Sequence, residues 1–225
     1  MSRFGSRKPH PLHYYLYISD TKLDMLFDQI DKGVLKKISA EVKVDLKLAS
    51  VTLREADDQG PTRMAKLKVV ERYLDANHNV GTVQEPGDEY FRGQMDMQWG
   101  FVEPSFGDPG ALFRGFDPED STCVVLVGST YHVLGEGPPR YGASCTALPK
   151  VMQLLLNSSD EELPDDWSEF ALHSDYYLSR IVPSQALDFL ALPLAEKRIQ
   201  AQVQEGEAPR QVHVILGTPL YVAVA

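Results

Sequence analysis

Residues 13–26 read His13-Tyr-Tyr-Leu-Tyr-Ile-Ser-Asp-Thr-Lys-Leu-Asp-Met-Leu26, and the hydrophobic period changes within this stretch. Residues 14–18 are apolar throughout, with aromatic and β-branched members, which is typical of a strand covered on both faces. From Leu23 to Ile30 the apolar residues recur at helical spacing, and Asp20 or Thr21 can cap that helix. The stretch therefore predicts a strand that leads directly into a helix.

A first candidate site lies where this strand meets the helix. Four polar residues stand there: Ser19, Asp20, Thr21 and Lys22. A carboxylate at the carboxyl end of a strand can bind a metal or a hydroxyl group, and a helix N-terminus favours an anion. Lys22 could reach a phosphate from this position. The structural alternative is that Asp20 or Thr21 serves only as the N-cap of the helix.

A second candidate site precedes the clearest strand of the chain. Apolar residues alternate with polar ones from Phe91 to Phe101, which predicts an antiparallel strand with one exposed face. Just before it, glycine, hydroxyl and carboxyl groups gather at Gly81, Thr82 and Glu85, as in many binding loops. Glu85 could act as a base or as a ligand. The alternative is a helix C-cap followed by a Pro-Gly turn.

A third candidate site follows the apolar strand that we predict at residues 124–127. Ser129 and Thr130 lie close to glycines, so backbone N–H groups in this segment could cradle a phosphate. The spacing matches neither the P-loop nor the dinucleotide-binding motif. The alternative is a hairpin turn before a strand at residues 131–134. His132 could act as a catalytic base, although a histidine beside apolar residues is more often part of a core.

The remaining segments predict both strands and helices. Helices are expected at residues 64–74, 146–156, 167–178 and 184–203, and strands at residues 42–48, 212–216 and 220–225. The Pro- and Gly-rich residues 103–120 predict a long loop. Adjacent strand pairs imply antiparallel ladders, so we expect an α+β (or α/β) fold with a mixed, largely antiparallel sheet and helices packed on it. Residues 1–11 form a flexible lead-in and residues 12–225 a single α+β domain in this interpretation; a division near residues 140–165 is the alternative.

The composition limits the classes of partner. The formal net charge is -10, which argues against broad binding to nucleic acid or anionic membranes. No apolar run approaches the ~20 residues that span a bilayer, and we expect no secretory signal. Two cysteines, Cys123 and Cys145, indicate a reducing compartment, so we expect a soluble, cytoplasmic protein. Because metal-ligand spacing is absent from the sequence, we expect no metal and no cofactor.

Three blocks of the sequence resemble an uncharacterised bacterial family. The first block is the opening Tyr14-Tyr-Leu-Tyr-Ile-Ser-Asp-Thr-Lys-Leu-Asp-Met-Leu26, and the last is Gly217-Thr-Pro-Leu-Tyr-Val-Ala223. The middle block comprises Gly81-Thr82, Glu85-Pro86-Gly87, Tyr90-Phe91, Gly93, Met97 and Trp99-Gly100. The resemblance covers nearly the whole chain, which implies one domain. It implies no established activity, so it assigns no catalytic residue.

Three functional hypotheses follow from these observations. The leading one is a binding or sensory module that holds a small polar ligand or a protein partner over the sheet edge near the candidate sites. The second is a hydrolase or transferase using Asp20, Glu85 and His132, which requires these three side chains to converge in one pocket. The third is a subunit that acts only through a protein interface, with residues 103–120 as its surface. The oligomeric state does not follow from the sequence.

Overall fold

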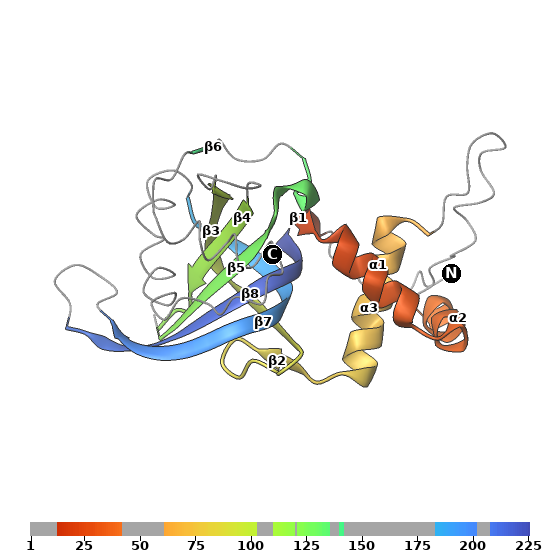
Figure 1. Ribbon diagram of the computed structural model, residues 1–225, viewed down its shortest axis with the longest axis horizontal. Coiled ribbons are helices and arrows are strands. Elements are labelled where there is room, and N and C mark those ends of the chain that lie inside the picture. The colour runs from red at the N-terminus through yellow and green to blue at the C-terminus, as the bar shows by residue number, and fades with distance from the viewer. Residues whose placement is uncertain are drawn as a thin grey trace, which may run out of the picture.

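The computed structural model describes residues 13–41, 61–102, 110–119, 121–135, 140–141, 183–201 and 208–225. Strands dominate this part of the chain, with 52% of residues in strands and 29% in helices. The expected α+β or α/β class is therefore wrong, because the fold is dominated by one mostly antiparallel sheet. The helices lie together on one side of the strands (Figure 1).

The order of helices and strands in the structure differs from the order that the sequence predicted. The helices are α1 (Asp20–Gln29), α2 (Lys32–Glu41) and α3 (Arg63–Asn77), and a 3₁₀ turn spans Thr130–His132. The strands are β1 (Tyr14–Ile18), β2 (Val80–Thr82), β3 (Tyr90–Val102), β4 (Gly110–Phe116), β5 (Thr122–Ser129), β6 (Arg140–Tyr141), β7 (Gln185–Ala201) and β8 (Arg210–Val224). None of the helices in the described ranges has the length and apolar character that a bilayer crossing requires.

Five of the described strands close a ring. β3 pairs with β4, β4 with β5, β5 with β8, β8 with β7, and β7 again with β3. Within this ring only the β5–β8 pair is parallel. β1 pairs antiparallel with the end of β8, beyond the part of β8 that pairs with β5. The ring therefore separates an inner face from an outer face, and β1 extends it toward the helices.

The inner face of the ring holds the larger apolar core. Alternate residues of β3 point inward and are buried, whereas Arg92, Gln94 and Asp96 are exposed. This confirms the alternation that predicted a strand with one exposed face. Facing strands complete the core with large side chains, including Phe113, Leu126, Phe189 and Ile215. Burial of each such side chain contributes about 1.5–3 kcal/mol, so this core is a main source of stability.

A second core lies between the helices and the outer face of the sheet. The apolar stripe of α3 packs there, which confirms the helix that its spacing predicted. The buried members from α3 are Leu67, Val69, Val70 and Leu74, and those from the sheet are Ile18, Tyr90, Leu190, Leu220, Tyr221 and Ala223. The strand and helix predicted for residues 14–30 are likewise confirmed as β1 and α1.

The helix expected at residues 184–203 is wrong, because Gln185–Ala201 form the long strand β7. Leu187, Phe189 and Ala191 face the inner core, and Leu190 faces the helices. A strand buried on both faces shows a continuous apolar run, which is compatible with the period of a helix as well as with that of a strand. Pro193 is accommodated at a register shift between β7 and β8, a position where a strand tolerates proline.

Three further expectations fail for related reasons. Part of the predicted loop 103–120 is β4, whose residues are almost all buried, and residues 103–109 lie outside the described part. The strand expected at residues 131–134 is mainly the 3₁₀ turn, with one isolated bridge from Tyr17 to Val133. The turn expected between 216 and 220 lies inside the continuous strand β8. The lead-in 1–11, the strand 42–48 and the helices 146–156 and 167–178 fall outside the described residues.

Candidate functional site

The first and third candidate segments lie side by side. The backbone N–H of Asp20 donates to Nδ1 of His132 over 3.3 Å, and the Thr21 hydroxyl lies 3.5 Å from Nε2 of the same ring. The chain after the 3₁₀ turn holds this arrangement, because the Leu134 N–H donates to the Leu16 carbonyl over 2.8 Å. The end of β1 and the 3₁₀ turn therefore form one surface.

His132 presents a neutral ring to this surface. Its Nδ1 accepts the Asp20 N–H, so the proton of the neutral imidazole sits on Nε2. Burial lowers the pKa of His132, Asp20 acts in the opposite direction, and the cations Lys22 and Arg63 lower it further. The ring therefore offers an Nε2–H donor at neutral pH.

Helices α1 and α3 begin next to each other at the same surface. The guanidinium of Arg63, the first residue of α3, lies 2.5 Å from the carboxylate of Asp20, the first residue of α1. One turn further along, Lys66 Nζ lies 2.6 Å from Asp24 Oδ1. The two helices therefore run in the same direction, and their N-terminal ends, each equivalent to about half a positive charge, are neighbours.

The two helix starts are capped differently. In α3 the Thr62 side chain accepts the Ala65 N–H over 3.3 Å. In α1 the N-cap is Ser19, one residue before the caps that we expected, and its side chain makes no capping hydrogen bond within the described structure. The first N–H groups of a helix have no intrahelical acceptor. The first turn of α1 is consequently the better placed of the two to donate to a ligand.

Lys22 faces the sheet. Its Nζ donates to the Thr218 hydroxyl over 2.8 Å and to the Pro219 carbonyl over 3.3 Å. Burial lowers the pKa of Lys22 to about 8. In this arrangement the ammonium group fastens the first turn of α1 to β8, and the phosphate contact that we expected from it would require those two hydrogen bonds to break.

The ring of a buried tyrosine, Tyr17, packs against the His132 ring. Tyr17 is fully buried, and its ring meets that of His132 edge-on at a centroid distance of 5.9 Å. Burial raises the pKa of Tyr17 to about 12, so the phenol stays protonated. A Cβ added at Gly128 would lie only 2.4 Å from the Tyr17 hydroxyl oxygen. Gly128 is therefore required for this packing.

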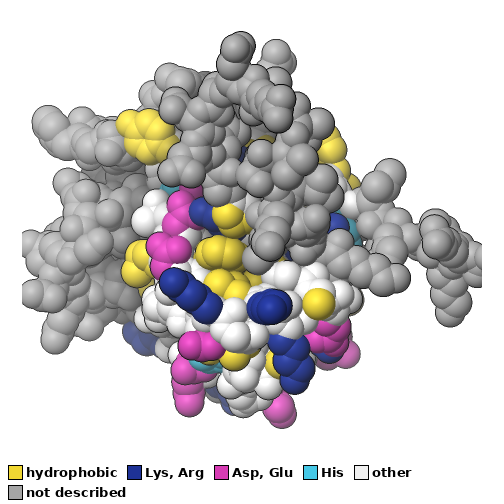
Figure 2. All heavy atoms as spheres, turned by 90° about the vertical axis from the view of Figure 1, so that its right-hand side faces the viewer, with side chains coloured by type: hydrophobic (Ala, Val, Ile, Leu, Met, Phe, Trp, Pro, Cys, Tyr) yellow, Lys and Arg dark blue, Asp and Glu magenta, His cyan; other side chains and the backbone are white. Residues whose placement is uncertain are grey.

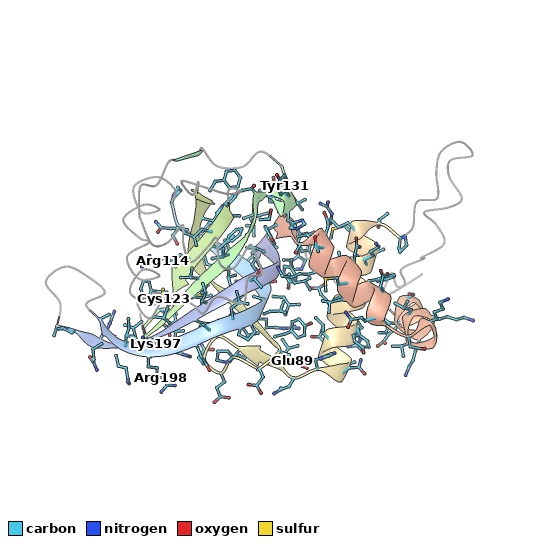
Figure 3. All side chains as sticks on the ribbon, in the orientation of Figure 1. Glu89, Arg114, Cys123, Tyr131, Lys197 and Arg198 are labelled. Carbon is cyan, nitrogen blue, oxygen red and sulfur yellow. The ribbon has the colours of Figure 1, made fainter. Side chains whose placement is uncertain are left out.

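Ser129 and Thr130 shape the turn that carries His132. The Ser129 hydroxyl accepts the Tyr131 N–H over 3.3 Å, and the Thr130 carbonyl accepts the Val133 N–H over 3.2 Å. The Tyr131 side chain is 76% exposed and lies at the end of β5, near the start of α1 (Figure 3). The segment is a short 3₁₀ turn rather than the phosphate-cradling loop that the glycines suggested.

The second candidate segment forms a compact turn of its own. The Thr82 N–H donates to the Glu85 carbonyl over 3.0 Å, and the Thr82 hydroxyl accepts the Glu85 N–H over 3.3 Å. A Cβ at Gly81 would lie 2.0 Å from the backbone nitrogen of Gly87. Backbone-to-backbone contact thus accounts for the glycine, and the Glu85 side chain is exposed.

This turn lies at the opposite end of α3 from His132. The helix has 15 residues, so its ends are about 22 Å apart. Arg63 is the first residue of α3 and lies beside Asp20, whereas β2 follows the last residue of α3 (Figure 1). Glu85 is therefore not brought together with Asp20 and His132, which do lie next to each other.

Two shallow hollows border the turn at 82–86. The larger, of about 390 Å³, is lined by Glu85, Glu196, Arg198 and His213 among others. His213 is already paired there with Glu196 at 3.0 Å. The smaller, of about 220 Å³, is lined by Thr82, Arg92, Met95 and Asp117 among others. Within the described ranges, no three of His, Cys, Asp and Glu converge as metal ligands.

Three residues of this surface were not predicted as site residues: Arg63, Tyr17 and Tyr131. Arg63 immediately precedes the helix predicted at 64–74, and a basic residue at a helix start is unusual because it meets the positive end of the dipole. A basic residue at this position could have indicated that Arg63 has a carboxylate or ligand partner. For Tyr17, inside an apolar run, no local signal distinguishes a ring beneath a site from ordinary core.

Comparison with known proteins gives a family and no activity. The model of a family of unknown function (DUF7019) matches residues 13–225. No curated protein and no solved structure matches significantly. The expectation of an uncharacterised family that covers nearly the whole chain is confirmed. The protein therefore belongs to the family of unknown function DUF7019.

Proposed function

We propose that this protein binds a small anionic ligand, carrying a phosphate or carboxylate group, where α1 and α3 begin. The contact between Arg63 and Asp20 carries the proposal, because it shows that the positive N-terminal ends of two helices are neighbours. Around that point the Nε2–H of His132, the Thr21 hydroxyl and the backbone N–H groups of Thr21 and Lys22 are hydrogen-bond donors, whereas the Asp20 N–H is already donated to His132.

The charge balance at this point supports an anion. Arg63 is 40% exposed and its partner Asp20 is 37% exposed, so water and a ligand both reach the pair. An arginine can contact two anionic groups through its several N–H donors. We therefore expect the anion to share Arg63 with Asp20. The overall charge of -10 opposes anion binding, so binding at this point depends on the local cation and hydrogen-bond donors.

The hydrogen bonds of His132 favour binding over catalysis. In a Ser-His-Asp arrangement a carboxylate accepts the Nδ1–H and thereby orients the histidine as a base. Here Nδ1 accepts a backbone N–H, and Asp20 Oδ2 lies 3.9 Å from it, beyond hydrogen-bond distance. The third residue of the catalytic hypothesis, Glu85, belongs to the turn at the other end of α3.

Two exposed aromatic rings indicate what else the ligand carries. Tyr131 precedes His132 and is 76% exposed, and Tyr14 at the start of β1 is 66% exposed. The Tyr14 hydroxyl lies 3.8 Å from the Cβ position at Gly135, three residues after the 3₁₀ turn, so only Tyr131 belongs to the turn that carries His132. Exposed tyrosines are common in recognition surfaces because they provide a large, rigid contact area. We therefore expect an aromatic anion to bind more tightly than a bare one.

Calorimetric titration tests this proposal with inorganic phosphate and phenyl phosphate as probes. We expect both to bind, phenyl phosphate more tightly, and Arg63→Gln to weaken each at least about tenfold, as loss of a charged hydrogen bond does. Tyr131→Ala should remove the preference for the phenyl group alone. Arg198→Gln, at the distant hollow, is the matched control and should bind normally. Failure of both probes to bind, or equal loss in both arginine variants, would overturn the proposal.

A further inference from the structure

A histidine 112 positions further along the chain caps the first turn of α1. The Ser19 N–H donates to the Leu220 carbonyl over 2.8 Å, and the Leu23 N–H makes the first helical hydrogen bond, to the Ser19 carbonyl over 2.9 Å. The first N–H of the helix, that of Asp20, has Nδ1 of His132 as its acceptor. Because the Ser19 side chain makes no capping hydrogen bond in the described structure, the imidazole takes the role of the N-cap side chain.

This cap depends on the protonation state of the ring. A neutral imidazole has one nitrogen that accepts a hydrogen bond, whereas an imidazolium ion has two N–H donors and no acceptor. Protonation of His132 at Nδ1 therefore places two N–H groups face to face and ends the hydrogen bond from Asp20. The Asp20 N–H then needs another acceptor, because a partly enclosed N–H without one costs free energy.

An acceptor for the new imidazolium proton is already close. Asp20 Oδ2 lies 3.9 Å from Nδ1 of His132, a short movement away from hydrogen-bond distance. The ring is 17% exposed, so its proton can exchange with solvent. When the ring turns to this carboxylate, the backbone N–H of the same residue is released. One proton thus exchanges the backbone of Asp20 for its side chain as the partner of His132.

We infer that the site takes up one proton together with its anion: His132 becomes protonated, turns to the Asp20 carboxylate, and releases the Asp20 N–H to the bound oxyanion. The anion then meets three consecutive backbone N–H groups, of Asp20, Thr21 and Lys22, beside the Nε2–H of His132. The proton comes from solvent, and no covalent bond to the ligand forms. This inference rests on the proposed function, because it concerns the regulation of the same site by pH.

The charges around the ring link the proton to the anion. Burial is the largest effect that lowers the pKa of His132; Asp20 of α1 raises it, and Lys22 of α1 and Arg63 of α3 lower it. From β1 the ring faces Tyr17, whose phenol stays protonated and adds no charge. The positive end of the α1 dipole also opposes an imidazolium ion. A bound anion offsets these positive charges, so it raises the pKa of His132.

This coupling determines how the affinity for an anion depends on pH. Below the pKa of ligand-free His132 the ring is already charged, so the affinity is highest there. Above that pKa each bound anion must bring a proton, so the affinity falls about tenfold per pH unit until the pH reaches the raised pKa of the complex. At still higher pH the ring stays neutral, and the remaining donors alone hold the anion.

Calorimetric titration with sulfate tests the inference, because sulfate keeps the same charge throughout and supplies no proton of its own. Titrations in buffers of different ionisation enthalpy also give the number of protons taken up. Between about pH 5.5 and pH 8.5 we expect the affinity to fall at least about tenfold, with proton uptake where it falls. His132→Gln should show neither effect. His213→Gln, whose ring pairs with Glu196 at the distant hollow, is the matched control and should retain both.

An NMR titration of the ligand-free protein keeps the test decisive if His132→Gln does not fold. We expect the Asp20 amide proton to move upfield, as a lost hydrogen bond requires, with the same midpoint as the His132 ring and below pH 6.5. An amide that does not follow the ring, or sulfate binding without pH dependence and proton uptake, would overturn the inference alone. Absence of sulfate binding would also overturn it, and the proposed function fails only if phosphate and phenyl phosphate do not bind either.

Discussion

Arg63 and Asp20, 43 positions apart in the chain, form an ion pair of 2.5 Å between the first residues of α3 and α1. The pair sets the register of the two helices, because the next pair, Lys66 with Asp24, lies one turn further along both. This arrangement puts the positive ends of two helix dipoles near each other, which is electrostatically unfavourable unless an acidic group or an anion is nearby. Asp20 meets part of this need, and the proposed ligand meets the rest.

The packing of Tyr17 beneath this site predicts opposite effects for two glycine substitutions. Gly128→Ala should destabilise the protein by about 1–3 kcal/mol, since its methyl group would overlap the Tyr17 hydroxyl in a closed core. Gly33→Ala is the matched control: in the exposed first turn of α2 its methyl group would meet only the exposed Asp31 carboxylate, at 3.0 Å, and it should stabilise by at most about 0.5 kcal/mol. Urea unfolding measures both. Equal stability of the two variants would contradict the packing described.

We expect the turn at residues 82–86 to contribute to stability through its backbone contacts and not through the Glu85 side chain. Gly81→Ala should cost about 3 kcal/mol, because the added carbon meets backbone atoms that cannot rotate away. Glu85→Gln, at an exposed side chain of the same turn, should change the free energy of unfolding by less than about 0.5 kcal/mol. Thermal unfolding of both variants checks this. A severe loss with Glu85→Gln would instead assign that carboxylate an interaction beyond those described.

The lowered pKa of Lys22 predicts that the free energy of unfolding increases above about pH 8. Its pKa in the folded protein is about 8, below the ordinary 10.5, so the unfolded chain binds more protons between these values. The free energy of unfolding therefore increases as the pH rises from 8 toward about 10. Lys22→Met should abolish this increase. Chemical denaturation at pH 8 and about pH 9.5 measures it; a slope that persists in the variant would exclude Lys22 as its source.

The helical face of the molecule explains why α1 and α3 were predictable, whereas α2 was not predicted. Charged side chains of both signs surround a limited apolar area there (Figure 2). The helices are amphipathic, so period and polarity agree along Leu23 to Ile30 and along Leu67 to Leu74. β3 was predictable for the same reason, because one of its faces is exposed.

Two of the strands that were missed contain segments that are buried on both sides. β4 and residues 187–191 of β7 lose most of the alternation that identifies a strand, and glycines in β4 imitate a loop. The ring closes through pairings between distant segments, such as Arg92 opposite Leu190. No local pattern encodes such a pairing. The sheet-dominated class could therefore not be distinguished from α+β by period alone.

The candidate site was predictable only in part. The polar residues after β1 were found because they interrupt a strand and begin a helix. That His132 lies beside them depends on the bridge between Tyr17 and Val133, which joins segments more than a hundred residues apart. The separation of Glu85 from both depends on the length and direction of α3. These are properties of the assembled fold.

The most direct test of the central claim is an amide-detected NMR titration of the full chain with inorganic phosphate. We predict saturable shifts concentrated at the backbone amides of Thr21 and Lys22, the Arg63 side chain and the His132 ring. We also predict a rise in the pKa of His132, because a bound anion favours imidazolium. Shifts concentrated instead around Arg198 and His213, or shifts that never saturate, would contradict an anion site at the paired helix N-termini.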